Sequence, residues 1–126
     1  MQMRQENVEF FTEREDEFAT LLIRIGTRKN VAKALVFLAN TRETTSHAIE
    51  RGTDMRQPEV SLAMRYLAEQ GWIKTRESES ESKGRPVKIY TLAKPLQEIM
   101  DCIEKEKVHE AENQLALVRK LRDHLK

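Results

Sequence analysis

The spacing of apolar residues changes at Gly71, and this change restricts the possible folds more than any other feature of the chain. Before Gly71, apolar residues recur every three or four positions, as on one face of an amphipathic helix. After Gly71, residues 72–80 and 86–93 follow the two-residue alternation of strands. Residues 81–86, Glu-Ser-Lys-Gly-Arg-Pro, are rich in turn formers and predict a hairpin. A long helical pattern then begins at Lys94.

Four helices are predicted before the hairpin. The first covers residues 8–25 and the second residues 28–40. Thr45 is suited to cap a third helix that ends at Gly52, where glycine would fit the left-handed position after a helix. The fourth begins near Pro58, whose missing N–H is harmless in a first turn. The third and fourth helices, joined by a short turn, have the pattern of a helix-turn-helix.

Composition and charge limit the class of protein. The chain has 39% hydrophobic and 34% charged residues, enough for a core beneath a highly charged surface. It has no window of about 18 apolar residues, and the segment MQMRQENVEF has no secretory signal. The single cysteine, Cys102, excludes an internal disulfide. We therefore expect a soluble, cytoplasmic protein with no membrane association.

Basic residues are concentrated in the middle of the chain. Residues 1–25 carry three basic and six acidic side chains, a net charge of −3. Residues 26–93 carry twelve basic and eight acidic side chains, a net charge of +4, and residues 94–126 carry seven of each. A basic excess in the segment with the helix-turn-helix favours a phosphate-binding surface there.

The order of three helices and a hairpin, with the residues that form them, resembles a known family. The stretch TTSHAIERGTDMRQPEVSLAMRYLAEQGWIKTRESESESKGRPVKIYTL resembles the DNA-binding core of prokaryotic winged-helix transcription regulators, with archaeal regulators of the MarR, ArsR and TrmB type as the nearest relatives. RQPEVSLAMRYLAEQGWI is similar to their recognition helix and its exit, and KGRPVKIYTL to the tip and return strand of their wing. The resemblance covers roughly residues 27–93, just over half of the chain.

The resemblance and the pattern together predict a mainly α fold with a small β-hairpin wing, a winged helix-turn-helix. Residues 1–25 would form an N-terminal helix that supports a dimer, and residues 26–93 the DNA-binding core. Residues 94–126 would form a long C-terminal dimerisation helix. We expect a homodimeric transcription regulator that binds double-stranded DNA, with a recognition helix over about 57–70 and a wing over about 72–92.

The fourth helix has two predicted faces. Val60, Ala63, Met64 and Leu67 gather on a face that would be buried. On the opposite face, Leu62 is suited to contact a thymine methyl group and Arg65 a guanine or a phosphate. The residues of this helix expected to contact DNA are Arg56, Gln57, Ser61, Leu62 and Arg65.

The wing supplies the second set of expected DNA contacts, namely Arg76, Lys83, Arg85 and Lys88. Arg85 lies at a tip that Pro86 stiffens, and an arginine so placed is suited to a minor groove. Before the tip, Glu77, Glu79 and Glu81 share one face of the outgoing strand. Because carboxylates repel phosphates, we expect this face to turn away from DNA or to pair with nearby Lys and Arg.

The long C-terminal helix carries a stripe of apolar residues that a chain of this size cannot cover alone. Pairing with a second copy as a coiled coil would bury it. The residues expected at the dimer interface are Phe11, Phe18, Leu22, Leu96, Ile99, Ile103, Leu115, Val118, Leu121 and Leu125. Cys102 is expected to pack near this seam, with a redox role as a weaker alternative.

Other classes of function remain open alternatives. The winged helix would also suit a protein-interaction module, or an RNA-binding accessory domain that does not bind an operator. Catalysis is not expected, because His47, His109 and His124 are far apart and show no motif spacing. We expect no cofactor and no metal site, since there is no second cysteine and no phosphate-binding glycine pattern. The operator sequence, the sign of regulation and any small-molecule effector are not indicated.

Overall fold

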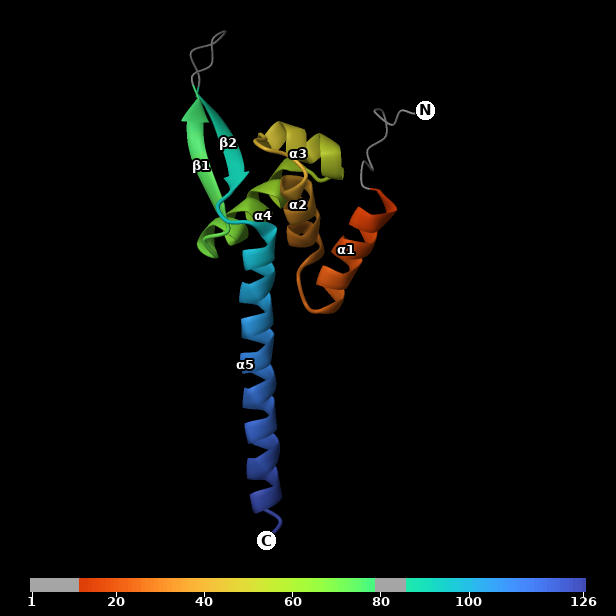
Figure 1. Cartoon of the computed structure of the whole chain (residues 1–126), viewed down its shortest axis with the longest axis vertical. Helices are drawn as coiled ribbons and strands as arrows, with labels where there is room; N and C mark the ends of the chain where they lie inside the picture. Colours follow the sequence, from red (N-terminus) through yellow and green to blue (C-terminus); the bar gives the residue numbers. More distant parts are fainter. Residues whose placement is uncertain (1–11, 79–85) are drawn as a thin grey trace. The chain divides into compact units, whose positions relative to one another are not determined.

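The computed structural model describes residues 12–78 and 86–126, and Figure 1 shows the whole chain. The elements follow in the order α1 (Glu13–Arg24), α2 (Lys29–Ala39), α3 (Ser46–Thr53), α4 (Gln57–Glu69), β1 (Ile73–Ser78), β2 (Val87–Leu92) and α5 (Leu96–Asp123). The chain forms two compact units, which are divided between Ala93 and Lys94. The predicted order of helices and hairpin is confirmed.

Helix α2 is the centre of the first unit. It packs against α1, α3 and α4, and Figure 1 shows it between α1 and α4. A helix covered on several sides must be apolar around most of its circumference. Accordingly its buried residues are Val31, Ala32, Ala34, Leu35, Val36 and Leu38.

Helix α1 begins at a capping box, and the predicted start of the first helix at residue 8 lies outside the described residues. The Glu15 backbone N–H donates to the Thr12 hydroxyl at 3.1 Å, and the Thr12 N–H donates to the Glu15 carboxylate at 2.8 Å. The acidic residues of its first turn, Glu13, Glu15 and Asp16, also suit the positive end of the helix dipole. Ala19 and Leu22 are its buried residues.

The helix-turn-helix departs from prediction at one glycine. Thr45 caps α3 as expected, its hydroxyl accepting from the Ala48 N–H at 3.2 Å. Gly52, however, lies inside α3 and is buried, and the left-handed residue that ends the helix is Asp54, with a φ of 58°. A Cβ atom on Gly52 would collide with the ring of Phe37. Glycine is therefore needed here for close packing against α2.

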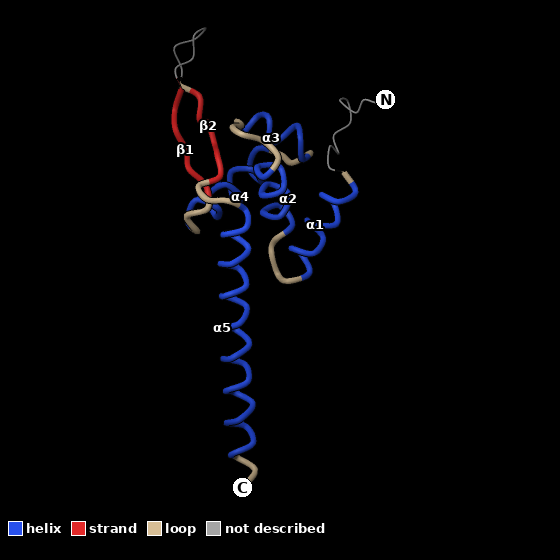
Figure 2. The backbone as a smooth tube through the Cα atoms, in the orientation of Figure 1, coloured by secondary structure: helices blue, strands red, loops and turns tan. Residues whose placement is uncertain are grey.

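The wing is an antiparallel pair of strands in which Ile73 lies opposite Leu92 and Ser78 opposite Val87. Figure 2 shows the hairpin following α4 through a short loop. A short bridge extends it, because the Thr44 N–H donates to the Tyr90 carbonyl at 3.0 Å and the Tyr90 N–H to the Thr44 carbonyl at 2.8 Å. The loop before α3 is thus attached to β2.

Helix α5 forms the second unit, with 28 residues. Ile99 and Ile103 are buried, whereas every residue from Val108 to Lys126 is exposed. None of the helices in the described ranges is both long and apolar enough to span a membrane.

Candidate nucleic-acid interface

Helix α4 has one buried and one exposed face, as its sequence predicts. Val60, Ala63, Met64 and Leu67 are all buried, and the helix packs against α2 and α3. On the other side Ser61, Leu62 and Arg65 are exposed. Leu62 keeps 63% of its surface accessible, although a solvated helix face is ordinarily polar.

The start of α4 is fixed by a backbone cap that leaves basic and polar side chains outside. The Arg56 N–H donates to the Glu59 carboxylate at 2.9 Å, so Glu59 acts within the chain, as expected of a residue three positions into a helix. Arg56 is the N-cap residue and its side chain makes no capping hydrogen bond. Arg56 and Gln57 are both exposed, beside the exposed face of α4.

The end of α4 is joined closely to the base of the wing. The Trp72 N–H donates to the Leu67 carbonyl at 3.0 Å, and the Trp72 carbonyl accepts from the Ala93 N–H at 2.7 Å. The Trp72 ring is buried and stacks edge-on against Tyr66, with ring centroids 6.3 Å apart. These contacts fix the hairpin base relative to α4, so the two candidate DNA-binding elements form one arrangement within the first unit.

Arg76 on β1 has a partner in its own chain. One of its terminal nitrogens donates to both carboxylate oxygens of Glu43 at 2.9 Å. Both side chains remain about half exposed, at 55% and 50%. Because Thr44 is bonded to β2 and Arg76 lies on β1, the ion pair reaches across the hairpin. A depression beside it is lined by Arg42, Glu43 and Thr91, and sequence reasoning did not single out Arg42.

The acidic arm of the wing is in part balanced by its neighbour. Glu77 lies directly opposite Lys88 in the strand register, where opposite charges are mildly stabilising. Lys88 is exposed, and the alternation of the strands places it on the other face of the hairpin from Arg76. Lys83 and Arg85, with Glu79 and Glu81, lie outside the described residues.

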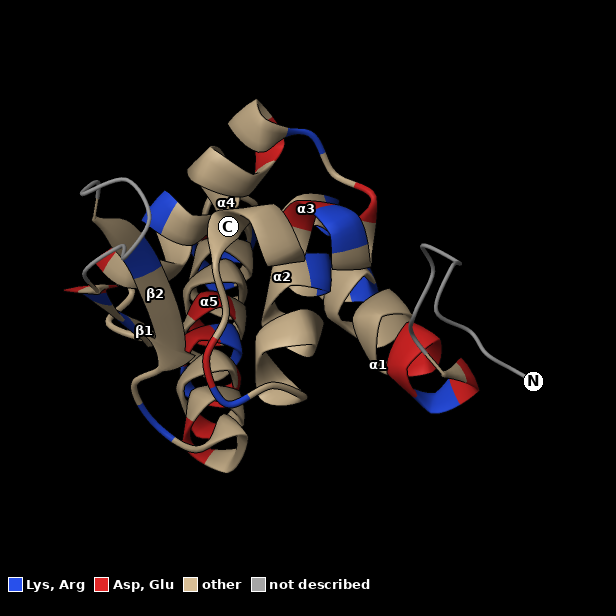
Figure 3. Ribbon diagram, turned by 90° about the horizontal axis from the view of Figure 1, so that it is seen from above, with Lys and Arg blue, Asp and Glu red and all other residues tan. Residues whose placement is uncertain are grey.

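The charged side chains of the first unit include an acidic cluster in α1 and several basic residues that have no ion-pair partner among the described residues. Figure 3 shows acidic positions concentrated at the start of α1. In the part of the chain that the structure describes, Arg56, Arg65 and Lys88 have no ion-pair partner. Arg56 and Arg65 are thus available for an external anion, while Lys88 also lies opposite Glu77.

The residues predicted to form a dimer interface fall into two groups. Leu22, Ile99 and Ile103 are already buried in a single chain, Phe18 and Leu96 are half-buried, and Phe11 lies outside the described residues. Leu115, Val118, Leu121 and Leu125 are exposed. Leu21 and Val108 are also exposed, and sequence reasoning did not single them out. Ile25, which belongs to the apolar pattern that predicts the first helix, is exposed as well but was not assigned to the interface. The spacing of Leu21 to Phe18 and Ile25 places all three on one side of a helix and could have identified it.

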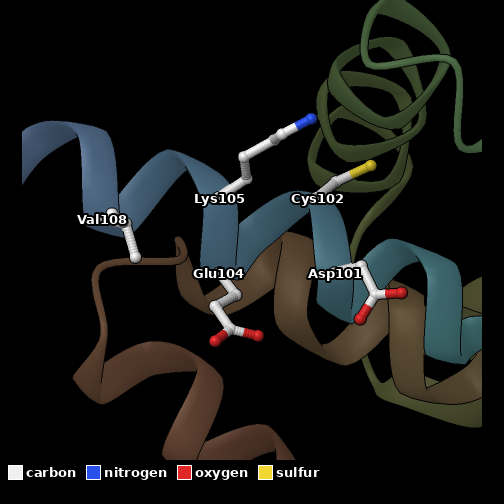
Figure 4. Close-up of a pocket in the computed structure, with 5 residues that line it drawn as sticks. All are labelled: Asp101, Cys102, Glu104, Lys105 and Val108. Atoms are coloured by element: carbon white, nitrogen blue, oxygen red, sulfur yellow. The ribbon is translucent and has the colours of Figure 1, made fainter.

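A second depression lies along α5 and is lined by Asp101, Cys102, Glu104, Lys105 and Val108. Figure 4 shows that these side chains do not converge, because Cys102 and Lys105 point to one side of the helix and Glu104 to another. Within residues 12–78 and 86–126, no group of three or more His, Cys, Asp or Glu side chains is placed to hold a metal ion.

No protein-family model matches the chain. No curated protein matches it either. Solved structures do match in fold. A possible transcriptional regulator from Methanosarcina mazei is 16% identical, with a TM-score of 0.64 over 86% of this chain and 88% of its own. TrmBL2, an archaeal chromatin protein described with a novel mode of DNA binding, is 16% identical, with a TM-score of 0.63 over 89% of this chain.

The match to TrmBL2 covers 40% of that protein, so the present chain corresponds to less than half of it. The transcriptional regulator SlyA is 19% identical, with a TM-score of 0.50 over 89% of this chain and 80% of its own. At such identities the likeness concerns the fold. The chain has the winged helix-turn-helix fold of transcriptional regulators, as its order of helices and hairpin predicts.

Proposed function

We propose that this protein binds double-stranded DNA in a sequence-specific manner, as a homodimeric transcription regulator. The observation that carries the proposal is the exposed face of α4. There Leu62 and Arg65 remain accessible while the opposite face is buried in the core. In a helix-turn-helix, the accessible face of the second helix is the one that enters the major groove.

Each residue on this face has a distinct role. Arg65 donates to a guanine edge or a phosphate, and Leu62 contacts a thymine methyl group. Arg56 and Gln57, at the start of the helix, reach a base edge or the backbone. Ser61 accepts or donates one hydrogen bond to a base or a phosphate. Glu59 stays bound to the Arg56 N–H and makes no contact with DNA.

The wing contributes contacts with the backbone and the minor groove. Lys88 and Lys83 neutralise phosphates, and Arg85 enters the minor groove. Arg76 is available to a phosphate only when it leaves Glu43, to which it is bonded in the free protein. The wing therefore adds affinity more than sequence discrimination.

The second copy is bound through α5. Leu115, Val118 and Leu125 are exposed on one side of this helix, and a coiled coil between two copies would cover them. Two-fold symmetry then requires a palindromic operator, with half-sites separated by one helical turn of DNA or a multiple of it.

The test is selection of bound fragments from a genomic library, followed by titration of the best duplex. Replacing Arg65 by Ala should weaken binding at least about tenfold, because each lost contact costs about 1–3 kcal/mol. Arg24→Ala is the matched control. It removes the same charge from α1, which packs on α2 away from α4 (Figures 1 and 3), and it should change affinity little.

Equal effects of the two variants would contradict the role of α4. Affinity should also fall by about 10³–10⁵ between 50 and 200 mM salt if the dimer makes about 6–10 phosphate contacts. Structured RNA should compete poorly with the selected duplex. If RNA competes better, or if the library yields no bound duplex, the protein is an RNA-binding or protein-interaction module.

A further inference from the structure

The exposed half of α5 carries a seven-residue repeat. Counting from Val108 in alternating steps of three and four reaches Ala111, Leu115, Val118, Arg122 and Leu125. All six residues are exposed and lie on one side of the helix. This seam (Val108, Ala111, Leu115, Val118, Arg122 and Leu125) has the spacing of the central positions of a coiled coil. Its one charged member is Arg122.

We infer that two copies of α5 pair in an antiparallel direction, with Leu115 of each opposite Val118 of the other. This inference rests on the homodimer of the proposed function and adds its geometry. Arg122 supplies the first argument. In a parallel pair in register, Arg122 would face Arg122 of the other copy within the seam, near its C-terminal end, and like charges that face each other repel.

The antiparallel alignment removes that repulsion. It sets Arg122 opposite Ala111 of the other copy, whose short side chain leaves room for the apolar stem of arginine while the charged end reaches water. It also sets Val108 opposite Leu125. Every seam residue except Ala111 then has an apolar partner, and all six positions are used.

The residues beside the seam supply the second argument. Glu112 and Arg119 lie on the same flank, one heptad apart, and in this antiparallel alignment Glu112 of each copy faces Arg119 of the other. The pair occurs twice by symmetry. If one helix were shifted along the other by seven residues, Glu112 could face Glu112 of the other copy. The charges beside the seam therefore also favour the register in which Leu115 faces Val118.

Two flanking contacts oppose this arrangement only weakly. A parallel pair would bring Lys107 to Glu112 of the other copy, but Lys107 already donates to Glu110 of its own chain at 3.3 Å. The antiparallel pair brings Lys105 near Lys126, which lies 3.8 Å from Asp123 of its own chain. Lys105 and Lys126 are both exposed, so water and salt screen the repulsion between them.

The direction of pairing sets the distance between the first residues of the two α5 helices. In the antiparallel alignment the two copies of Leu96 are about 60 Å apart, given a rise of 1.5 Å per residue. In a parallel pair they would be about 10 Å apart. Since each DNA-binding core is joined to the start of its own α5, the antiparallel dimer holds two cores at opposite ends of a rod.

Disulfide trapping distinguishes the two directions in the full-length protein. In a Cys102→Ser background, Val108→Cys and Leu125→Cys chains are mixed and oxidised. The antiparallel dimer should give a disulfide between the two different chains, while Val108→Cys alone should give none, because its two copies would be about 26 Å apart. Leu117→Cys, on the outer side of the helix, is the matched control and should not cross-link.

A disulfide in the Val108→Cys protein alone would establish parallel pairing and overturn the inference, with the proposed homodimer intact. A protein that is monomeric in sedimentation would overturn both the inference and the homodimer. Spin labels on the natural Cys102 give an independent measurement. The label-to-label distance should be about 45 Å in the antiparallel dimer, and a distance of about 10–20 Å would overturn it.

Discussion

At Gly52, inside α3, no side chain larger than hydrogen has room, because the ring of Phe37 occupies the place of a Cβ atom. We expect Gly52→Ala to lower the free energy of unfolding by about 1–3 kcal/mol, the usual cost of overpacking a core. This loss should exceed the gain that alanine brings to a helix, about 1 kcal/mol. Urea denaturation measures the difference.

Gly71→Ala is the control for this prediction. Gly71 has a φ of 78° and open space around its Cβ position, so its substitution should cost only the backbone strain of about 1–2 kcal/mol. A Phe37→Leu, Gly52→Ala double variant replaces the ring by a smaller side chain. It should recover part of the stability that Gly52→Ala loses. If the double variant is no more stable than the sum of the single changes predicts, the contact with Phe37 does not account for the glycine.

The ion pair between Arg76 and Glu43 leads to a second prediction at the residue scale. Glu43→Gln should change the free energy of unfolding by less than about 1 kcal/mol, because both partners are about half exposed. Binding to duplex DNA at low salt should become a few-fold tighter, since Arg76 no longer has a competing carboxylate. Fluorescence anisotropy measures the change, and Glu17→Gln on α1, where Glu17 is exposed, controls for net charge.

Weaker binding by Glu43→Gln would give Arg76 a different role. It would then act by holding the wing against the loop before α3, and not by touching a phosphate. Stability and affinity measured on the same variant separate these roles, because a loosened wing lowers affinity without loss of the core.

Sequence reasoning at the residue scale succeeded where one element decides the outcome. The buried and exposed faces of α4 follow from helical spacing alone, and Val60 and Leu62 lie as predicted. The partner of Arg76 was not predictable, because Glu43 is 33 positions away and is brought close by the fold. The prediction that Gly52 ends α3 was wrong for a related reason. A sequence does not distinguish a glycine required by close packing from a glycine required by a positive φ.

At the scale of elements, α5 allows a direct test of the dimer interface, because two of its leucines are equally exposed on opposite sides of the helix. Leu115 lies in the seam and Leu117 outside it, and each is 54% exposed. Leu115→Asp should weaken the dimer by at least about 100-fold, since it buries two unpaired carboxylates in an apolar seam. Leu117→Asp should leave the dimer intact. Sedimentation velocity over a range of concentrations measures both.

If both variants dissociate to the same extent, the loss comes from added charge on α5 and the seam lies elsewhere. If neither dissociates, α1 is the remaining candidate for the interface, because Leu21 and Ile25 are exposed there. Circular dichroism controls for loss of helix, and an exposed leucine on a helix of 28 residues should tolerate the change.

The elements themselves were predictable to the extent that their patterns are local. The four helices, the hairpin and α5 each have a period or a cap that can be read from consecutive residues. The bridge between Thr44 and Tyr90 was not predicted, because a single pair of residues has no period. The division of the apolar residues of α5 into buried Ile103 and exposed Leu115 was also not predicted, since one continuous stripe does not reveal which part its own chain covers.

At the scale of the whole molecule, the direction in which α5 pairs sets the expected spacing between the two half-sites of the operator. An antiparallel dimer separates the two copies of Leu96 by about 60 Å, which is closer to two helical turns of DNA than to one, at about 34–36 Å per turn. We expect footprinting on the selected duplex to show two protected half-sites with centres about two turns apart. Inserting half a turn, about 5 base pairs, between them should weaken binding strongly, because the second core would then face the wrong side of the duplex.

Inserting a full turn tests the stiffness of the rod. Half-sites about three turns apart, roughly 100 Å, are farther apart than the two copies of Leu96, so we expect affinity to fall toward that of a single half-site. The monomeric Leu115→Asp protein should bind all these duplexes equally, because each of its cores acts alone. Half-sites found one turn apart would instead require cores that lie side by side, as in a parallel pair, and would agree with a disulfide in the Val108→Cys protein alone.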